Sequence, residues 1–114
     1  MHELSIASAI IDAVRKEAEK RPDTRVSKVG VRIGALSGVE PDALSFGFSA
    51  LVEGSELDPL TLEIELVPRS QRCPACNITF EVKDEVLACP QCGMPETLLA
   101  GGDELDIAYL EVED

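Results

Sequence analysis

The stretch that decides the fold is Cys73-Pro-Ala-Cys76, followed after twelve residues by Cys89-Pro-Gln-Cys92, and it holds all four cysteines of the chain. Two Cys-x-x-Cys pairs at this separation can surround one Zn²⁺ with four thiolates in a tetrahedron, with Zn–S bonds of about 2.3 Å. A site with four sulfur ligands is closed and leaves no open position for a substrate. We therefore expect Cys73, Cys76, Cys89 and Cys92 to bind one structural zinc ion in a zinc ribbon.

The residues beside the cysteines also suit a metal site. A Cys-Pro-x-Cys turn offers backbone N–H groups to sulfur, and the metal displaces the thiol protons. Gly93 after the second pair, and Asn77 after the first, can take the positive φ with which the chain leaves such a turn. We expect Val82, Val86 and Leu87 to form a small hairpin between the pairs. The alternative is a site that loosens and responds to pH, redox state or a partner.

The composition is that of an acidic globular protein. The chain has 114 residues, 45% of them apolar, and a formal net charge of −12. This length suits one ordinary domain, or a small domain with an inserted module. Nucleic-acid binding needs clustered Lys and Arg, whereas the few bases near the cysteines, such as Arg69 and Lys83, stand among acidic residues. We therefore expect no nucleic-acid partner.

The sequence predicts neither membrane insertion nor export. No stretch approaches the roughly 20 apolar residues of a membrane span. Glu3 stands where a signal peptide would be basic, and Asp12 interrupts the apolar face. We expect a cytoplasmic protein, and in that compartment paired Cys-x-x-Cys motifs favour zinc over disulfides. A thioredoxin-like redox site is the alternative, although one isolated pair would suffice for it.

Hydrophobic periodicity outside the cysteines predicts two helices and three strands. Apolar residues recur at helical spacing over residues 4–20, and a second helix begins near Pro41 and ends near Gly54. Alternation at a period of two predicts the strands. The predicted strands are 29–33, 60–67 and 97–112, the last with a turn or bulge at Gly101-Gly102 and with Val112 out of phase.

These elements together predict an α+β fold. Two helices pack on one face of a small three-stranded sheet, and the zinc ribbon is inserted between two strands. The expected apolar stripe of the second helix is Leu44, Phe48, Leu51 and Val52, and that of the second strand is Leu60, Leu62, Ile64 and Leu66. The domain boundaries that follow are residues 1–69 plus 96–114 for the α/β domain and 70–95 for the ribbon.

A second candidate metal site lies at the N-terminus, which reads Met1-His2-Glu3 and carries the only histidine. The His2 imidazole stands beside its own amide nitrogen and the α-amine of Met1, and three such nitrogens can close fused chelate rings around one ion. Nitrogen ligands in a plane suit Ni²⁺ or Cu²⁺. Glu3 adds an amide nitrogen or a carboxylate, and Glu40 could also approach. The alternative is a lone, solvated histidine at a frayed terminus, and spacing alone does not decide between the two.

Several segments of the chain together resemble a known family. They are Met1-His2-Glu3-Leu4-Ser5, Gly34-Ala35-Leu36-Ser37-Gly38-Val39, Pro41-Asp42-Ala43-Leu44-Ser45-Phe46-Gly47-Phe48, the paired cysteine motifs, and Gly102-Asp103-Glu104-Leu105-Asp106-Ile107. In this order they resemble the HypA/HybF family of hydrogenase nickel-incorporation proteins, over essentially the whole chain.

The resemblance implies a nickel metallochaperone and not an enzyme. Its implied partners are a maturation nickel GTPase and the large-subunit precursor of [NiFe]-hydrogenase, or in some cases urease. It implies that His2 binds Ni²⁺ together with the Met1 amine and nitrogens near Glu3, and that the four cysteines bind Zn²⁺. Nickel is then the transferred cargo and zinc the structural ion. The sequence leaves a monomer or a dimer open, including a domain-swapped dimer.

Two other classes of function compete with this reading. One is an acidic zinc-ribbon adaptor without nickel chemistry, and nickel binding at the first residues separates it from the metallochaperone. The other is an enzyme, which the sequence disfavours because it holds no second histidine, no Gly-rich phosphate loop and no nucleophile motif. Carboxylates such as Glu40 and Asp42 more often cap a helix than act as acid and base.

Overall fold

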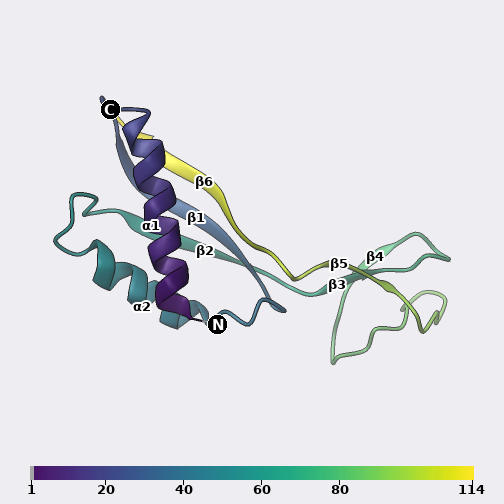
Figure 1. Cartoon of the computed structure of the whole chain (residues 1–114). Helices are drawn as coiled ribbons and strands as arrows, with labels where there is room; N and C mark the ends of the chain where they lie inside the picture. The colour runs from purple at the N-terminus through teal and green to yellow at the C-terminus, as the bar shows by residue number, and fades with distance from the viewer. Residues whose placement is uncertain (1) are drawn as a thin grey trace. The chain divides into compact units, whose positions relative to one another are not determined.

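The computed structural model describes residues 2–114, so Met1 lies outside the described residues. The elements in chain order are α1 (Glu3–Glu19), β1 (Arg25–Gly34), α2 (Pro41–Val52), β2 (Thr61–Val67), β3 (Ser70–Arg72), β4 (Thr79–Glu81), β5 (Leu98–Gly101) and β6 (Leu105–Glu113) (Figure 1). Two helices with two small sheets confirm the predicted α+β class. None of the described helices is both long enough and apolar enough to cross a bilayer.

The described chain forms two compact units. The helical unit contains residues up to Arg32, Gly38–Glu65 and Asp106–Asp114, and the cysteine unit contains Ile33–Ser37 and Leu66–Leu105. The cysteine unit is therefore larger than the ribbon expected at 70–95. It includes the segment after β1 because the Ala35 N–H donates to the Val67 carbonyl at 2.9 Å and the Leu36 N–H donates to the Gly102 carbonyl at 2.6 Å.

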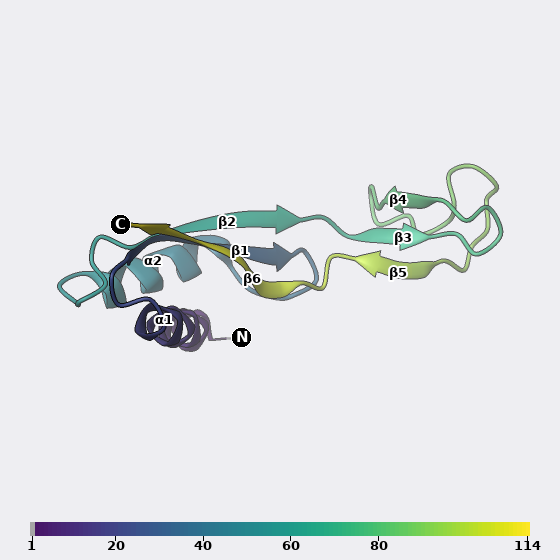
Figure 2. The same ribbon diagram turned by 90° about the horizontal axis from the view of Figure 1, so that it is seen from above.

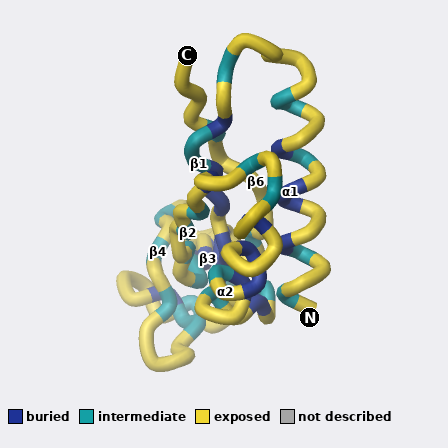
Figure 3. Tube along the Cα trace, turned by 90° about the vertical axis from the view of Figure 1, so that its left-hand side faces the viewer, coloured by how far each residue is buried: buried dark blue, intermediate teal, exposed yellow. Residues whose placement is uncertain are grey.

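In the helical unit both helices cover the same face of a three-stranded sheet with the order β2-β1-β6 (Figure 2). Pro41 begins α2 at a position where its missing N–H leaves no hydrogen bond unmade. The buried side of α1 faces the core, as the dark blue positions in Figure 3 show. The buried apolar side chains come mainly from α1, β1 and α2: Ala7, Ile10, Ile11, Val14, Val26, Val29, Val31, Leu44, Phe48 and Val52.

Two residues of the predicted apolar stripes of the second helix and second strand are exposed. Leu51 is 40% exposed, and Gly47 takes its place on the buried side of α2. Leu66 is 64% exposed because it stands near the end of β2, an edge strand of its sheet. Both predictions were wrong for the same reason. Periodicity indicates which face of a helix or strand is apolar, but it does not indicate how much of that face the neighbouring helices and strands cover.

The single strand predicted over 97–112 is two strands. β5 ends at Gly101 and pairs antiparallel with β3 in a second sheet of order β4-β3-β5, whereas β6 belongs to the helical unit's sheet. The break falls at Gly102, whose φ of 111° is open to glycine. A side chain there would also meet the Arg69 backbone, because a Cβ would lie 2.6 Å from the Arg69 Cα. The predicted turn at Gly101-Gly102 is thus a strand boundary.

β6 places apolar residues on both faces of its sheet. The Tyr109 ring lies against Gly30, where a Cβ would come within 2.0 Å of the ring. On the other face, Leu110 and Val112 line a hollow together with Glu17 and Arg21 at the end of α1. Val112 is therefore out of phase with Tyr109 because the two side chains use opposite faces of the strand.

The hydroxyl of Tyr109 is expected to ionise at an unusually high pH. Its hydroxyl donates a hydrogen bond to the Glu63 carboxylate, and this bond, with burial and the charges of Glu111 and Glu65, raises the pKa of Tyr109 to about 12 from 10.0. Tyr109 is the only tyrosine and the chain has no tryptophan, so ultraviolet absorbance reports its ionisation alone. We expect a midpoint near pH 12.

The raised pKa also fixes the direction of a pH effect on stability. The contribution of Tyr109 is complete below the unfolded pKa of about 10 and is lost as the pH rises through the folded value. Glu63→Ala should move the midpoint back toward 10, whereas Glu65→Ala should change it little. An unshifted midpoint in Glu63→Ala would contradict this account of the hydrogen bond.

Candidate metal centre and N-terminal site

The two Cys-x-x-Cys turns have the same backbone hydrogen bonds. In the first turn the Asn77 N–H donates to the Cys73 carbonyl at 2.8 Å, and the Cys73 N–H donates to the Ile78 carbonyl at 2.9 Å. In the second turn Gly93 N–H to the Cys89 carbonyl and Cys89 N–H to the Met94 carbonyl repeat this pattern, each at 2.9 Å. The chain leaves the turns at φ values of 61° for Asn77 and 78° for Gly93, which confirms the predicted positive φ at both.

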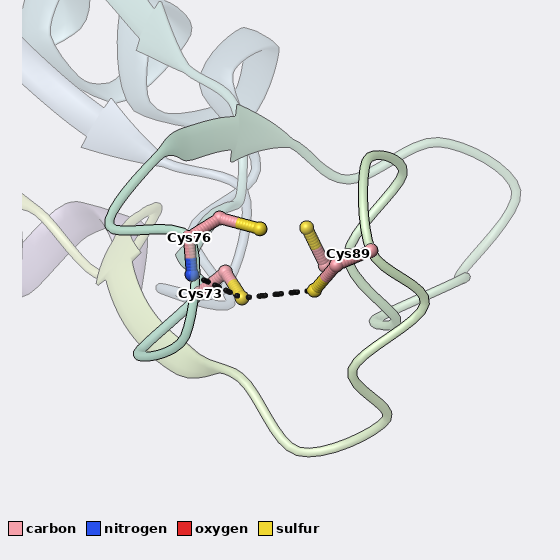
Figure 4. A group of neighbouring side chains, drawn as sticks. Cys73, Cys76 and Cys89 are labelled. Carbon is pink, nitrogen blue, oxygen red and sulfur yellow. Dashed lines mark hydrogen bonds between the residues drawn. The ribbon is translucent and has the colours of Figure 1, made fainter.

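The four predicted cysteines form one cluster. Their sulfur atoms all lie within 4.8 Å of one another, and the Cys73 and Cys92 Sγ atoms are 3.6 Å apart. In Figure 4 the labelled side chains turn their sulfurs toward a common centre. A tetrahedral Zn²⁺ with Zn–S bonds of about 2.3 Å would set neighbouring sulfurs about 3.8 Å apart. The donor set and its spacing therefore fit a metal ion with four thiolate ligands.

The electrostatics of the cluster call for a cation. Hydrogen bonding with Cys92, burial and the nearby Cys89 and Cys73 thiols raise the pKa of the Cys76 thiol to about 12. Burial also acts to raise the pKa of Cys89, but hydrogen bonds from the backbone of Cys92 and Gln91 outweigh it and lower that pKa to about 7. One thiol thus ionises at the expense of another, and four thiolates can coexist at this spacing only around a positive ion.

The cysteine unit has little apolar core apart from the cysteines. From Leu66 to Leu105 the only buried apolar side chains are those of Cys73, 0% exposed, and Cys89, 3% exposed. The predicted hairpin between the cysteine pairs is present as a tight turn, in which Lys83 pairs with Val86. We therefore expect the cysteine unit to depend on a bound metal ion for its stability, because burial of apolar side chains elsewhere in residues 66–105 offers too little.

A polar network connects the segments that precede the two cysteine pairs, and it was not predicted from the sequence. Gln71, which is 3% exposed, donates from Nε2 to the Thr97 hydroxyl at 3.0 Å, and that hydroxyl donates to the Leu87 carbonyl at 2.6 Å. Gln71 and Leu87 each stand two residues before a cysteine pair. The signal in the sequence is weak, since a glutamine in a short polar strand is ordinarily exposed.

At the N-terminus, His2 is the exposed N-cap residue of α1 and has an extended backbone. Its carbonyl accepts the first helical hydrogen bond, from the Ile6 N–H at 3.2 Å. Met1 lies outside the described residues, so the structure describes only His2 and Glu3 of the predicted nickel ligands. His2 is therefore accessible at the surface, directly before α1.

Glu3 has a partner that spacing could not reveal. One of its carboxylate oxygens accepts a hydrogen bond from the Glu40 backbone N–H at 3.0 Å. Glu40 is the N-cap residue of α2, and this bond is the main cause of the lowered pKa of the Glu3 carboxyl. The structure thus brings Glu40 next to Glu3 through its backbone, and the Glu3 carboxylate holds the starts of α1 and α2 together.

Comparison with known proteins gives one consistent match. A family model described as "Hydrogenase/urease nickel incorporation, metallochaperone, hypA" matches residues 1–112. A hydrogenase maturation factor HypA from Roseiflexus sp. (strain RS-1) is 41% identical over 115 residues, covering 100% of this chain and 94% of the relative. Hydrogenase maturation factor HypA 2 from Bradyrhizobium diazoefficiens is 38% identical, covering 99% of this chain and 100% of the relative.

Solved structures share the fold. The solution structure of the Ni metallochaperone HypA from Helicobacter pylori superposes with a TM-score of 0.64 at 24% identity, covering 97% of both chains. A second structure, described as the solution structure of HypA protein, gives a TM-score of 0.71, also at 24% identity, covering 97% of this chain and 95% of the other. These similarities extend over both units of the chain.

Proposed function

We propose that this chain carries Ni²⁺ at its N-terminus and delivers it during the maturation of [NiFe]-hydrogenase. The chain belongs to the HypA family of hydrogenase/urease nickel-incorporation metallochaperones. A protein of this family is a maturation factor and not a catalytic enzyme. The observation that carries the proposal is the exposed His2 at the start of α1. The proposed ligands are the Met1 amine, the His2 imidazole and amide, and a nitrogen of Glu3.

The hydrogen bond between Glu3 and Glu40 supports nitrogen ligation at this residue. A carboxylate that already accepts a charge-assisted hydrogen bond is less available to a metal, which is why the proposed donor at Glu3 is a nitrogen. Nitrogen ligands in a plane favour Ni²⁺ over Zn²⁺, which prefers tetrahedral sites. A terminal, exposed site with few ligands also suits a carrier, because no folding energy is tied to the ion that must be released.

The cysteine cluster has the other role in this proposal. Four thiolates at tetrahedral spacing suit Zn²⁺, and a closed set of ligands holds the ion permanently. The two sites therefore separate the metals by ligand chemistry, with sulfur for the resident zinc and nitrogen for the transferred nickel. The partners that we propose are a maturation nickel GTPase and the hydrogenase large-subunit precursor, in the cytoplasm.

Metal stoichiometry tests this function directly. Untagged protein should bind one Zn²⁺ and, on titration, one Ni²⁺ per chain, because the proposal gives each metal its own site. His2→Ala should keep the zinc and lose the nickel, with an unchanged far-ultraviolet circular dichroism spectrum. Ser5→Ala, an exposed change in the same first helical turn, is the matched control and should keep both metals. Zinc without nickel in the untagged wild type would leave an acidic zinc-ribbon adaptor.

A further inference from the structure

The two cysteine turns are held in place in different ways. The first turn lies between β3 and β4, where Arg72 pairs with Thr79, so strand pairing fixes it on both sides. The second turn lies between β4 and β5. Residues 82–97, which the structure describes in full, contain no helix or strand apart from an isolated bridge between Lys83 and Val86. Strand pairing alone therefore does not join the start of the second turn to the first.

Side-chain hydrogen bonds make that connection. The Thr97 hydroxyl donates to the Leu87 carbonyl at 2.6 Å, and this bond joins the two ends of the loop that carries the second cysteine pair. Gln71 on β3 donates from Nε2 to the same hydroxyl at 3.0 Å, so the closed loop is attached to the strand that leads into the first pair. We call Gln71, Thr97 and the Leu87 carbonyl the polar clamp.

The polar clamp has one consistent direction of donors and acceptors. The Thr97 hydroxyl gives its only hydrogen to the Leu87 carbonyl, so it accepts from the amide nitrogen of Gln71. The amide oxygen of Gln71 accepts from the Arg69 Nε at 3.4 Å. Gln71 is 3% exposed, and a buried amide is tolerated where its polar groups have partners. An apolar side chain there would enlarge a small core, so the glutamine contributes directional bonds in place of apolar burial.

Hydrogen bonds within each turn fix the shape of that turn but not its orientation relative to the other. The backbone bonds repeat between the turns, and the Cys76 N–H also donates to the Cys73 Sγ at 3.3 Å. In a tetrahedral site, the plane through the ion and the two sulfurs of one turn is perpendicular to the corresponding plane of the other turn. In a square-planar site the two planes coincide. Zn²⁺ prefers the first arrangement, and Ni²⁺ accepts the second.

We propose that the polar clamp keeps the two turns from rotating into one plane and thereby excludes Ni²⁺ from the cysteine site. Gln71 and Thr97 are then positioning residues that set the metal specificity of the site without being ligands themselves. This inference rests on the proposed function, in which zinc is the resident ion and nickel the cargo. A nickel carrier needs such a device because nickel enclosed by four sulfurs would not be available for transfer.

Metal competition at the cysteine site tests the polar clamp. The affinities for Zn²⁺ and Ni²⁺ are measured on the full-length protein by competition with a chelator. Nickel at the cysteines is identified by its sulfur-to-nickel charge-transfer absorbance, which nitrogen ligands do not give. Thr97→Val removes the hydroxyl with little change of shape and should lower the Zn²⁺ affinity by roughly 10–100-fold, as loss of a group that supports a metal ligand does at other sites. The Ni²⁺ affinity of the cysteines should fall much less, because a square-planar ion does not need this orientation of the turns.

The ratio of the Zn²⁺ to the Ni²⁺ affinity separates positioning from a general loss of stability. A variant that only destabilises the cysteine unit lowers both affinities by the same factor, because either ion binds the same folded unit. Thr97→Ser keeps the hydroxyl and should restore the wild-type ratio. Thr79→Val is the matched control, at an exposed threonine on β4 outside the polar clamp, and should keep the wild-type ratio. Gln71→Met combined with Thr97→Val should change the ratio no more than either change alone, because both act through one network.

An unchanged ratio in both Thr97→Val and Gln71→Met would overturn the polar clamp, and so would an equal fall of the ratio in Thr97→Ser. A wild-type protein whose cysteines prefer Ni²⁺ to Zn²⁺ would refute the zinc role of the cluster and this inference with it. Nickel at the N-terminus gives no sulfur charge-transfer band. Failure of the proposed N-terminal site would therefore be seen separately and would leave this test unaffected.

Discussion

Cys89→Ser should unfold the cysteine unit while the helical unit stays folded. Zinc binding contributes about 10–16 kcal/mol at structural sites of zinc-finger peptides, and the whole stability of a small protein is roughly 5–15 kcal/mol. The cysteine unit cannot replace that contribution, since its only buried apolar side chains from Leu66 to Leu105 are two of the ligands themselves. The helical unit has its own core from α1, β1 and α2.

The measurement is a ¹H–¹⁵N correlation spectrum of the full-length variant. Amide signals of residues 66–105 should collapse into the narrow range of an unfolded chain, while those of α1 and α2 keep their dispersion. Ala75→Ser is the matched control, because it places a serine in the first cysteine turn without removing a ligand, and its spectrum should match the wild type. Removal of zinc from the wild type with a chelator should reproduce the Cys89→Ser spectrum. Retained dispersion in residues 66–105 without metal would contradict this account.

The sequence was most informative where a local rule determines the structure. The turns at the cysteines, the start of α2 at Pro41 and the positive φ of Asn77 and Gly93 follow from constraints within a few residues. The four cysteines could be assigned to one cluster for the same reason. Each pair lies in a turn of known form, so the cluster requires only that the two turns come into contact.

Longer-range features could not be predicted in this way. The split of the third strand at Gly102 depends on the close approach of the Arg69 backbone, which is distant in the sequence. The hydrogen bond from the Glu40 N–H to the Glu3 carboxylate joins residues that no local pattern relates. The exposure of Leu51 is a third case, because an apolar residue on the apolar stripe of a helix is ordinarily counted as core.

A short extension before Met1, such as Gly-Ser, should abolish nickel binding although every residue of the chain is still present. The proposed site uses the free α-amine, and an extension converts that amine into an amide whose nitrogen lies in a longer chain. The chelate rings around the ion then lose their terminal member. Changes to groups that only support a ligand lower metal affinity by roughly 10–100-fold, so loss of a direct ligand should cost more than that.

Affinity measured by competition with a nickel-binding dye provides the test. The same Gly-Ser extension placed after Asp114 is the matched control and should leave nickel affinity unchanged. Both proteins should retain one zinc and the wild-type circular dichroism spectrum, because the cysteine cluster does not involve the terminus. Undiminished nickel affinity in the N-terminally extended protein would exclude the amine as a ligand. The imidazole of His2 would then have to bind nickel together with other donors, such as backbone nitrogens or the Glu3 carboxylate oxygen that does not accept the Glu40 N–H.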